Sequence, residues 1–355
     1  SGLLQNGKGT QIVGCLGLFT QPKLPLSRFA VLMISADTIT AINGLAQEGR
    51  PFCFALNFEG DEAIVGTDED WKRRGILFQM GDFSNFAPAE IPLSPADWLP
   101  QPMPYEAYRR AYDVVHAHLL AGNSYLVNLT CPTPVQTGMN LETIFHRSRA
   151  PYKMLWPGRF AVFSPETFVR IRDGVISTFP MKGTIDADLP DAASKILADR
   201  KELAEHVTIV DLLRNDLNRV ACDVRVQRFR YLDRIETNRK NLLQVSSEIS
   251  GRLPEDYRAR LGNILAELLP AGSVSGAPKA KTLKIIQEAE GAPRGFYTGI
   301  MGRFDGRNVE SAVMIRFVEQ GPDGLVFRSG GGITVFSKPQ DEYNELIDKV
   351  YVPIA

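Results

Sequence analysis

The sequence predicts a mixed fold of strands and helices, of the α/β or α+β class, from three observations. Short apolar runs bounded by turn residues, such as 52–58 and 160–163, are typical of strands. Apolar residues also recur at helical spacing, as they do over 105–119. Hydrophobic residues make up 44% of the 355-residue chain, which is enough for a large core. Periodicity alone does not choose between the two classes.

The first part of the chain leans towards strands, and a proline-rich stretch over 84–104 then predicts an irregular connection. A helix is expected from Tyr105, with Gly122 as its C-terminal stop. A single helix is expected over 191–217. The later elements are expected to be a strand over Tyr125–Thr130, a strand over Val175–Phe179, a helix from Pro278 to about Gly291, a strand over Gly324–Ser329, and a final helix through Tyr351 that a capping box at Ser337–Gln340 opens.

Charge, hydropathy and cysteine usage exclude several classes of partner. The formal net charge is −1 without a basic stripe, so we expect no contact with nucleic acid. No apolar run approaches the roughly 20 residues that span a bilayer, and Ser1-Gly2 does not open a signal peptide. The four cysteines are scattered, and Cys15 is expected to be a buried structural residue. We therefore expect a cytoplasmic protein that contacts no membrane.

Two pairs of acidic residues recur at helical spacing. Glu202 and Glu205 lie three residues apart on one expected helix, and Glu342 and Glu345 repeat this spacing on the last one. Side chains at this spacing share a helix face, so two such pairs supply the oxygen ligands that Mg²⁺ prefers. The alternative is a solvated face, on which the glutamates pair with lysines such as Lys201.

Two glycine-containing segments suit a bound anion. Gly330–Gly332 lies between an expected strand and an expected helix, where backbone N–H groups can approach an anion closely. The segment Gly272–Lys279 opens a helix, whose free N–H groups and dipole favour a carboxylate. The alternatives are a tight turn in the first segment and a simple N-cap at Ser275 in the second.

Lys182 follows an expected strand and is flanked by Pro180 and Gly183. A lysine held in a cleft acts as a nucleophile when its amine is neutral. The alternative, which describes most lysines, is a solvated side chain.

The order of several motifs along the chain resembles the chorismate-binding enzyme family. The resemblance covers 105–355, about seventy per cent of the chain, and the ordered motifs make it specific. Residues 1–104 correspond to a shortened N-terminal part of the same fold. The motifs are Ala121–Thr130, Phe163–Glu166, Pro180–Thr184, Ala204–His206, Val210–Asp216, Gly272–Lys279, Tyr297–Gly299, Ile315-Arg316 and Gly330–Lys349.

The resemblance implies two stacked sheets flanked by helices, and a site that converts chorismate with Mg²⁺. Glu205 and Glu345 match the direct metal ligands, and Glu202 and Glu342 match their neighbouring shell. Glu166 matches the general acid. The positions that match substrate-binding residues of the family are Ser275, Gly276, Tyr297, Arg316, Gly330, Gly332 and Lys349.

The residue type at position 182 indicates which branch of the family the sequence resembles. Pro180–Thr184 is similar to the aminodeoxychorismate synthase branch, whereas anthranilate synthases carry alanine where this chain has Lys182. Isochorismate and salicylate synthases carry a water-activating lysine at the position of Leu126. Gln244 stands where anthranilate and salicylate synthases carry a histidine associated with pyruvate loss. The resemblance thus implies amination of chorismate, with ammonia from a glutamine amidotransferase partner, and leaves anthranilate synthase component I as the alternative.

Overall fold

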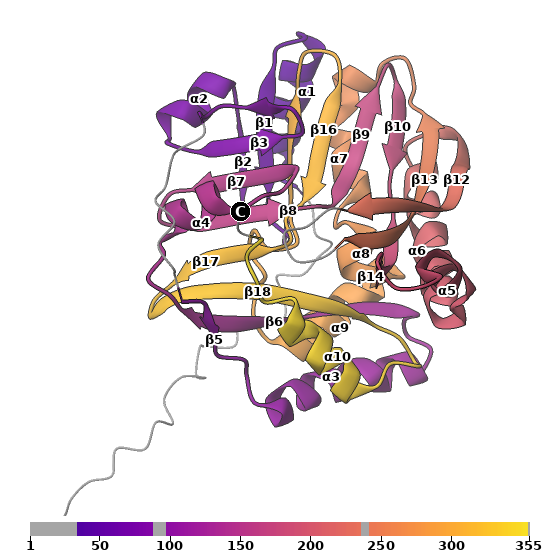
Figure 1. Cartoon of the computed structure of the whole chain (residues 1–355). Helices are drawn as coiled ribbons and strands as arrows, with labels where there is room; N and C mark the ends of the chain where they lie inside the picture. Colours follow the sequence, from indigo (N-terminus) through magenta and orange to yellow (C-terminus); the bar gives the residue numbers. More distant parts are fainter. Residues whose placement is uncertain (1–33, 88–96, 236–240, 354–355) are drawn as a thin grey trace, which may run out of the picture. The chain divides into compact units, whose positions relative to one another are not determined.

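A computed structural model of the chain describes residues 34–87, 97–235 and 241–353 (Figure 1). Within these residues, the strands form two antiparallel sheets of nine strands each, and helices pack against them. The predicted mixed fold with two sheets and flanking helices is confirmed. Cys15 lies outside the described residues. In the described parts of the chain, none of the helices combines the length and apolar character needed to cross a membrane.

The first sheet has the strand order β11-β13-β10-β9-β16-β15-β1-β2, and β12 also pairs with β13. Its strands are β1 (Phe52–Leu56), β2 (Ala63–Gly66), β9 (Thr167–Arg172), β10 (Val175–Thr178), β11 (Met181–Asp186), β12 (Cys222–Ile235), β13 (Leu242–Arg252), β15 (Ile300–Phe304) and β16 (Val309–Val313).

The second sheet has the order β14-β6-β18-β17-β8-β7-β3-β4, and β5 also pairs with β6. Strands from the segment before residue 105 therefore pair within both sheets, and the division of the chain at 104/105 stays a prediction. The strands are β3 (Leu77–Met80), β4 (Phe83–Ser84), β5 (Leu99–Pro100), β6 (Leu126–Gln136), β7 (Tyr152–Trp156), β8 (Phe160–Ser164), β14 (Gly276–Ala277), β17 (Phe317–Gly321) and β18 (Gly324–Ile333).

The helices pack in groups against the two sheets. α1 and α7 contact each other and share a core with the first sheet, whereas α3, α9 and α10 pack on β6 and β18 of the second. The helices are α1 (Ala36–Gln47), α2 (Asp68–Arg73), α3 (Tyr105–Leu120), α4 (Leu141–Arg147), α5 (Ala192–Ala198), α6 (Arg200–Asn218), the 3₁₀ helix η2 (Tyr257–Arg260), α7 (Leu261–Leu268), α8 (Gly272–Ser275), α9 (Lys279–Glu290) and α10 (Pro339–Asp348).

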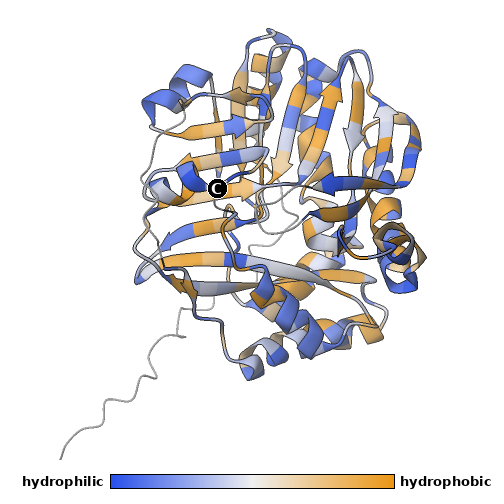
Figure 2. Cartoon of the chain, viewed as in Figure 1, coloured by the Kyte–Doolittle hydropathy of each residue, from blue (hydrophilic) through white to orange (hydrophobic). Residues whose placement is uncertain are grey.

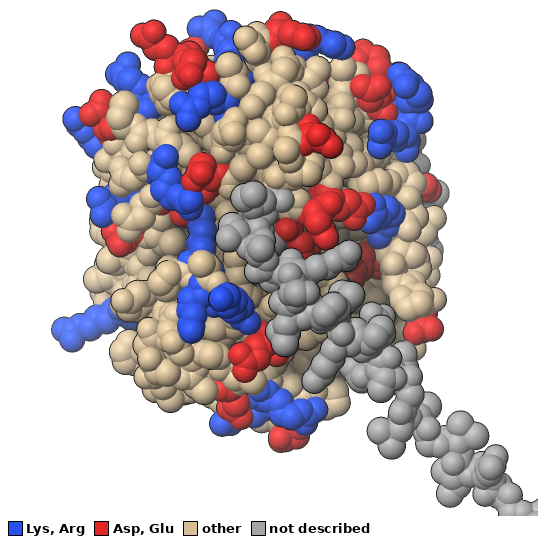
Figure 3. Space-filling view, turned by 180° about the vertical axis from the view of Figure 1, so that it is seen from behind, with Lys and Arg blue, Asp and Glu red and all other residues tan. Residues whose placement is uncertain are grey.

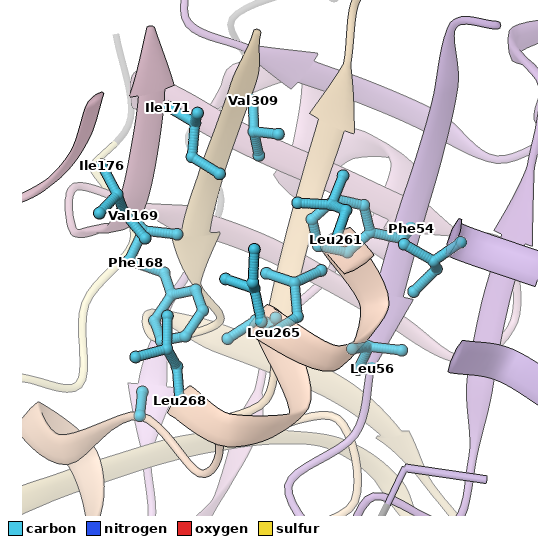
Figure 4. Packing of buried hydrophobic residues seen from close by; sticks show 14 of the residues in the cluster. Phe54, Leu56, Phe168, Val169, Ile171, Ile176, Leu261, Leu265, Leu268 and Val309 are labelled. Carbon is cyan, nitrogen blue, oxygen red and sulfur yellow. The ribbon is translucent and has the colours of Figure 1, made fainter. Parts of the chain in front are cut away.

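The alternation of side chains along β1 shows how the layers stack. Phe54 and Leu56 point towards the helices and pack in one core with Leu261 and Leu265 of α7 (Figure 4). Cys53 and Ala55, which alternate with them, have the opposite orientation, because successive side chains of a strand face opposite sides. Cys53 belongs to a second core, which also contains residues of the second sheet. The first sheet is therefore covered on both faces.

The hydropathy of the strands and helices follows this layering. Figure 2 shows hydrophobic stretches along the strands of both sheets, whereas α3 and α10 carry residues of both kinds. Burying one face of such helices supplies most of their stability, because isolated helices of this length are marginal in water. On the face seen in Figure 3, acidic and basic side chains are interspersed over the described surface.

The predicted helix over 191–217 is wrong as a single element, because the chain breaks between α5 and α6. Asp199 has extended backbone angles and caps α6, and its carboxylate accepts hydrogen bonds from the backbone N–H groups of Lys201 and Glu202. Aspartate is a favoured N-cap because its side chain satisfies N–H groups that have no partner in the first turn. The cap fixes where the turn that carries Glu202 begins.

The predicted cap of the last helix at Ser337 is also wrong, and so is the alternative of an N-cap at Ser275. The last helix begins at Pro339 with Lys338 as its N-cap, and Ser337 instead accepts a hydrogen bond from the backbone of Thr334. Ser275 does not cap α9, whose N-cap is Pro278; its hydroxyl donates to the carbonyl of Ala271, the residue before α8. By contrast, the predicted helix from 105 and the helix that ends before Gly291 are confirmed.

Candidate active site

Both sheets contribute to one pocket, which holds about 210 Å³ of space that water can enter. β11 and β13 line it from the first sheet, and β6 and β18 line it from the second. The structure brings together in this pocket the following residues predicted from the sequence: Glu166, Lys182, Gln244, Tyr297, Arg316, Gly330, Gly332 and Lys349.

A bulge directs Lys182 into the pocket. The register between β11 and β13 shifts between Met181 and Thr184, and Gly183 within this shift has a φ of 89°. Bulges re-aim side chains, and this positive φ favours glycine. The Lys182 amine lies 4.0 Å from Glu205, and a methyl group on Gly332 would lie 3.6 Å from it. The Lys182 amine therefore lies between Glu205 and the backbone of Gly332.

Glu166 lies between β8 and β9, and its backbone is held on both sides. Its N–H donates to the hydroxyl of Ser164, and its carbonyl accepts from the N–H of Val313. The Glu166 residue as a whole is partly exposed, but protein atoms surround its carboxyl group. This burial raises the pKa of Glu166, although a hydrogen bond from Ser273 and the charge of Lys182 oppose the shift. Burial therefore shifts the balance of this carboxyl group towards its protonated form.

Two further cationic side chains, those of Lys349 and Arg316, line the pocket. The Lys349 amine donates to the carbonyl of Gly330 at 3.0 Å and pairs with Glu345 at 2.7 Å. Arg316 has a φ of 53° and donates to the carbonyl of Lys349 at 2.9 Å. Because both cations line the pocket beside the glycine run, this wall is suited to bind anionic groups.

The remaining predicted binding residues have different positions. Tyr297 is buried at the pocket wall, and burial raises the pKa of its hydroxyl. Ser275 and Gly276 do not line the pocket. In Gly276 a φ of 132° brings the chain so close to Leu126 that no side chain fits there. Direct contact of Ser275 and Gly276 with a ligand stays a prediction.

The four predicted metal-binding glutamates come from α6 and α10 and influence one another's charge. Burial raises the pKa of Glu202, as does the nearby charge of Glu205. Burial likewise raises the pKa of Glu342, with a contribution from Glu345. Lys201 is close enough to all four carboxylates that they together raise its pKa against the effect of desolvation. The two helices therefore place four carboxylates around one region.

The donor chemistry of these glutamates suits a hard cation, but their arrangement is not a closed ligand cage. Among residues 34–87, 97–235 and 241–353, no group of three or more acidic, histidine or cysteine side chains is arranged to hold a metal ion. Glu205 and Glu345 instead pair with Lys201, at 3.7 Å, and Lys349. Carboxylate oxygens are nevertheless the ligands that Mg²⁺ prefers.

Several pocket residues were not singled out from the sequence. Ser273 donates a hydrogen bond to Glu166 at 2.5 Å, and Asn128 and Ser329 also line the pocket. Ser273 lies within the Gly272–Lys279 segment that the sequence indicated, but the sequence does not reveal which of its serines faces Glu166.

Arg294 is a second contribution that the sequence did not reveal. Its buried guanidinium pairs with Glu290 of α9 at 2.6 Å and donates to the carbonyls of Asn128 and Val274. This arginine therefore connects α8, α9 and β6 behind the pocket. Each such bond to a charged group contributes about 1.5–3 kcal/mol to stability.

The chain is similar to known proteins over most of its length. The model of the chorismate binding enzyme family matches residues 69–355, and the chain therefore belongs to this family. The match begins before the 105–355 region that the sequence motifs cover.

Several individual proteins are similar to this chain. Two of them carry the name "uncharacterized PabA-like protein". The one from Pasteurella multocida is 50% identical over 318 residues, which span 89% of this chain and 98% of the relative. The one from Haemophilus influenzae is 48% identical over 316 residues, which span 89% of this chain and 96% of the relative. The crystal structure of anthranilate synthase component I from Streptococcus pneumoniae is 26% identical with a TM-score of 0.62, and the match covers 73% of this chain and 60% of that one.

Proposed function

We propose that the chain is aminodeoxychorismate synthase component I, which converts chorismate and ammonia to 4-amino-4-deoxychorismate for p-aminobenzoate and folate synthesis. The observation that carries the proposal is the presence of Lys182 and the enclosed carboxyl group of Glu166 in one pocket. An amine and a protonated acid are the two groups that a covalent replacement of a hydroxyl requires. The two PabA-like relatives, which match nearly their whole length, support this branch of the family.

The cationic wall would hold the substrate. Chorismate carries two carboxylates, and Arg316, Lys349 and the backbone of Gly330–Gly332 offer charge and N–H groups on the side where Lys349 lies. Binding the two carboxylates there would fix the ring between Lys182 and Glu166. Holding reacting groups in such a geometry lowers the barrier because less motion has to be lost during the reaction.

The proposed chemistry has two halves that balance. In the first, the neutral amine of Lys182 bonds to C2, the ring double bonds shift, and the C4–O bond breaks. The hydroxyl takes the proton of Glu166 and leaves as water. In the second, ammonia bonds to C4 and the C2–N bond breaks, so Lys182 leaves as a neutral amine. The new ammonium group at C4 returns one proton to Glu166. The enolpyruvyl group is retained throughout.

Mg²⁺ is part of the proposal, with Glu205 and Glu345 as direct ligands and Glu202 and Glu342 beside them. When bound, the ion would supply Lewis-acid chemistry that stabilises negative charge developing on the substrate. The lysines that pair with Glu205 and Glu345 have other partners or solvent available, because the Lys201 side chain is 58% exposed and Lys349 also bonds to Gly330.

Ammonia is proposed to come from a separate glutamine amidotransferase. The experiment compares amination by free ammonium with amination by glutamine in the presence of such a partner. Glutamine-dependent turnover that requires the partner supports the assignment. Turnover with ammonium but never with glutamine and the partner contradicts this part of the proposal.

Anthranilate synthase component I is the second candidate, because its Streptococcus pneumoniae structure shares the fold. Lys182 and Gln244 argue against this candidate. The resemblance implies that anthranilate synthases carry alanine at the position of Lys182 and histidine at the position of Gln244. Incubation with chorismate, Mg²⁺ and ammonium distinguishes the two by direct analysis of the product. Formation of anthranilate as the direct product would overturn the proposal, whereas 4-amino-4-deoxychorismate supports it.

The role of Lys182 has its own test. We expect Lys182→Ala to reduce amination by at least about 1,000-fold, because loss of a nucleophile removes the covalent route. Lys281→Ala, at an exposed position of α9, is the matched control and should leave turnover unchanged. Steady-state turnover and the thermal unfolding midpoint are measured for both variants. Wild-type turnover by the Lys182 variant contradicts a covalent role for this residue.

A further inference from the structure

Glu166 borders two cavities. With Pro180 and Ser273 it lines the substrate pocket, and the same three residues line a smaller inner cavity of about 20 Å³. The inner cavity reaches towards Thr178 and Asp216. A volume of roughly 10–15 Å³ on this measure is enough for one water molecule. Glu166 therefore lies at the boundary between the two cavities, where the direction of its carboxyl group depends on its contacts.

Ser273 provides that contact. Its hydroxyl donates to Oε1 of Glu166 at 2.5 Å, across 107 residues of sequence. The short helix α8 that carries Ser273 is itself held, because the carbonyl of Val274 accepts from Arg294 and the hydroxyl of Ser275 donates to Ala271. A hydroxyl on such a restrained turn can hold a carboxyl group in one orientation, as a neighbouring hydrogen-bonding group does for a reactive side chain.

We propose that Ser273 is a positioning residue, which keeps the carboxyl group of Glu166 turned towards the substrate pocket and away from the inner cavity. The proposal rests on the proposed function, in which Glu166 is the proton donor to the leaving hydroxyl. Ser273 takes no part in bond making. It acts through the direction and the protonation of Glu166.

The groups around Glu166 set the expected effect of losing the hydroxyl. Lys182 on β11 lies on one side, and its charge favours the ionised carboxyl. Asp216 of α6 lines the inner cavity and is paired with Lys279 at 2.9 Å, and Tyr297 and Arg316 line the substrate pocket. The Ser273 hydroxyl stabilises the ionised form of Glu166 by donating to it, so its removal raises the pKa of Glu166 further.

The experiment compares Ser273→Ala with Ser273→Thr, which keeps the hydroxyl. In Ser273→Ala we expect kcat to fall about 10-fold, the size of one hydrogen bond to an ionisable group, with KM changed less than about 3-fold. Activity is lost at high pH as Glu166 loses its proton, so this limb of the kcat profile should move to higher pH. Ser273→Thr should restore both kcat and the limb. Ser246→Ala, a buried serine on β13 outside the pocket, is the control and should change neither.

Three results overturn the proposal. They are an unchanged kcat and pH limb in Ser273→Ala, equal damage in the threonine and alanine variants, and a rise in KM alone, which would make Ser273 a substrate-binding residue.

A second readout does not depend on the reaction. The side-chain carboxyl of Glu166 is followed by ¹³C NMR, and the signal missing in Glu166→Gln identifies it. Its titration midpoint should move upward in Ser273→Ala and return in Ser273→Thr, whatever product the enzyme makes. If the wild type forms a product other than 4-amino-4-deoxychorismate while this shift appears, the proposed function fails and the positioning role stands. If amination is confirmed and the midpoint does not move, the positioning role fails alone.

Discussion

The two acidic regions of the site differ in how their charge is controlled. The carboxyl group of Glu166 is surrounded by protein atoms and bonded to Ser273, and burial raises its pKa. Among the four glutamates of α6 and α10, Glu205 and Glu345 pair with lysines, and the Glu345 side chain is 56% exposed. Burial alone would raise the pKa of Glu345, but Lys349 holds it below its usual range.

The difference shows that glutamates in two environments are suited to two kinds of chemistry. A single enclosed carboxyl favours its protonated form and is suited to give a proton. Carboxylates that pair with lysines, as Glu205 and Glu345 do, are suited to exchange those lysines for a cation. Added Mg²⁺ should therefore compensate for changes in the glutamates of α6 and α10 but not for a change in Glu166. The following variants test this contrast.

The largest effect is expected for Glu166→Gln. Loss of a general acid slows a reaction by roughly 100- to 10,000-fold, and added Mg²⁺ should not restore the rate. Because the glutamine cannot titrate, the fall in activity at high pH that is due to Glu166 should also disappear. The kcat profile across pH is measured at saturating Mg²⁺. Glu106→Gln, at an exposed position of α3, serves as the control. Recovery of the rate at high Mg²⁺ would show that the two regions are not separate.

A smaller and rescuable effect is expected for Glu202→Gln. Losing a residue beside the proposed metal ligands should weaken metal binding by about 10- to 100-fold, so more Mg²⁺ should be needed for half-maximal activity. The rate at saturating Mg²⁺ should approach that of the wild type. Calorimetric titration with Mg²⁺ gives the affinity without turnover, and Glu267→Gln on α7 is the matched change outside the cluster. An unchanged Mg²⁺ affinity would argue against a metal role for this region.

The smallest effect is expected for Lys201→Met. This lysine is 58% exposed and lies 3.7 Å from Glu205, so it competes weakly with a cation for the carboxylates. Exposed ion pairs contribute little, and its removal should tighten Mg²⁺ binding by only about 2-fold. The exposed Lys281→Met of α9 should show no change in the same titration. Weaker Mg²⁺ binding in Lys201→Met would contradict the view that lysines act as replaceable counterions.

The sequence predicted those parts of the fold that depend on local chemistry. The helix from Tyr105 and the helix that ends before Gly291 follow from apolar spacing and a glycine stop, and both are present. The break at Asp199 was missed because apolar spacing continues across it, whereas the cap depends on backbone angles. Ser337 failed as a cap because its hydroxyl is used within the preceding turn.

The candidate site shows the same division. The ordered motifs led to the residues that line the pocket, since motif order reflects the family to which the chain belongs. Sequence order could not show that Ser273 reaches Glu166 or that Arg294 joins three elements, because both contacts link distant segments. The side chains of Ser273 and Ser275 differ in role because residues two apart on a helix face different directions.

The arginine behind the pocket has a consequence for local opening of the molecule. Arg294 bonds to Glu290, Asn128 and Val274, so β6, α8 and α9 cannot separate without breaking several bonds at once. Elements linked in this way open as one cooperative unit, and their amide hydrogens exchange with solvent together. The backbone amides of β6, α8 and α9 around Arg294 should therefore exchange together at one slow rate, and the part of the pocket that these elements line should open as a unit.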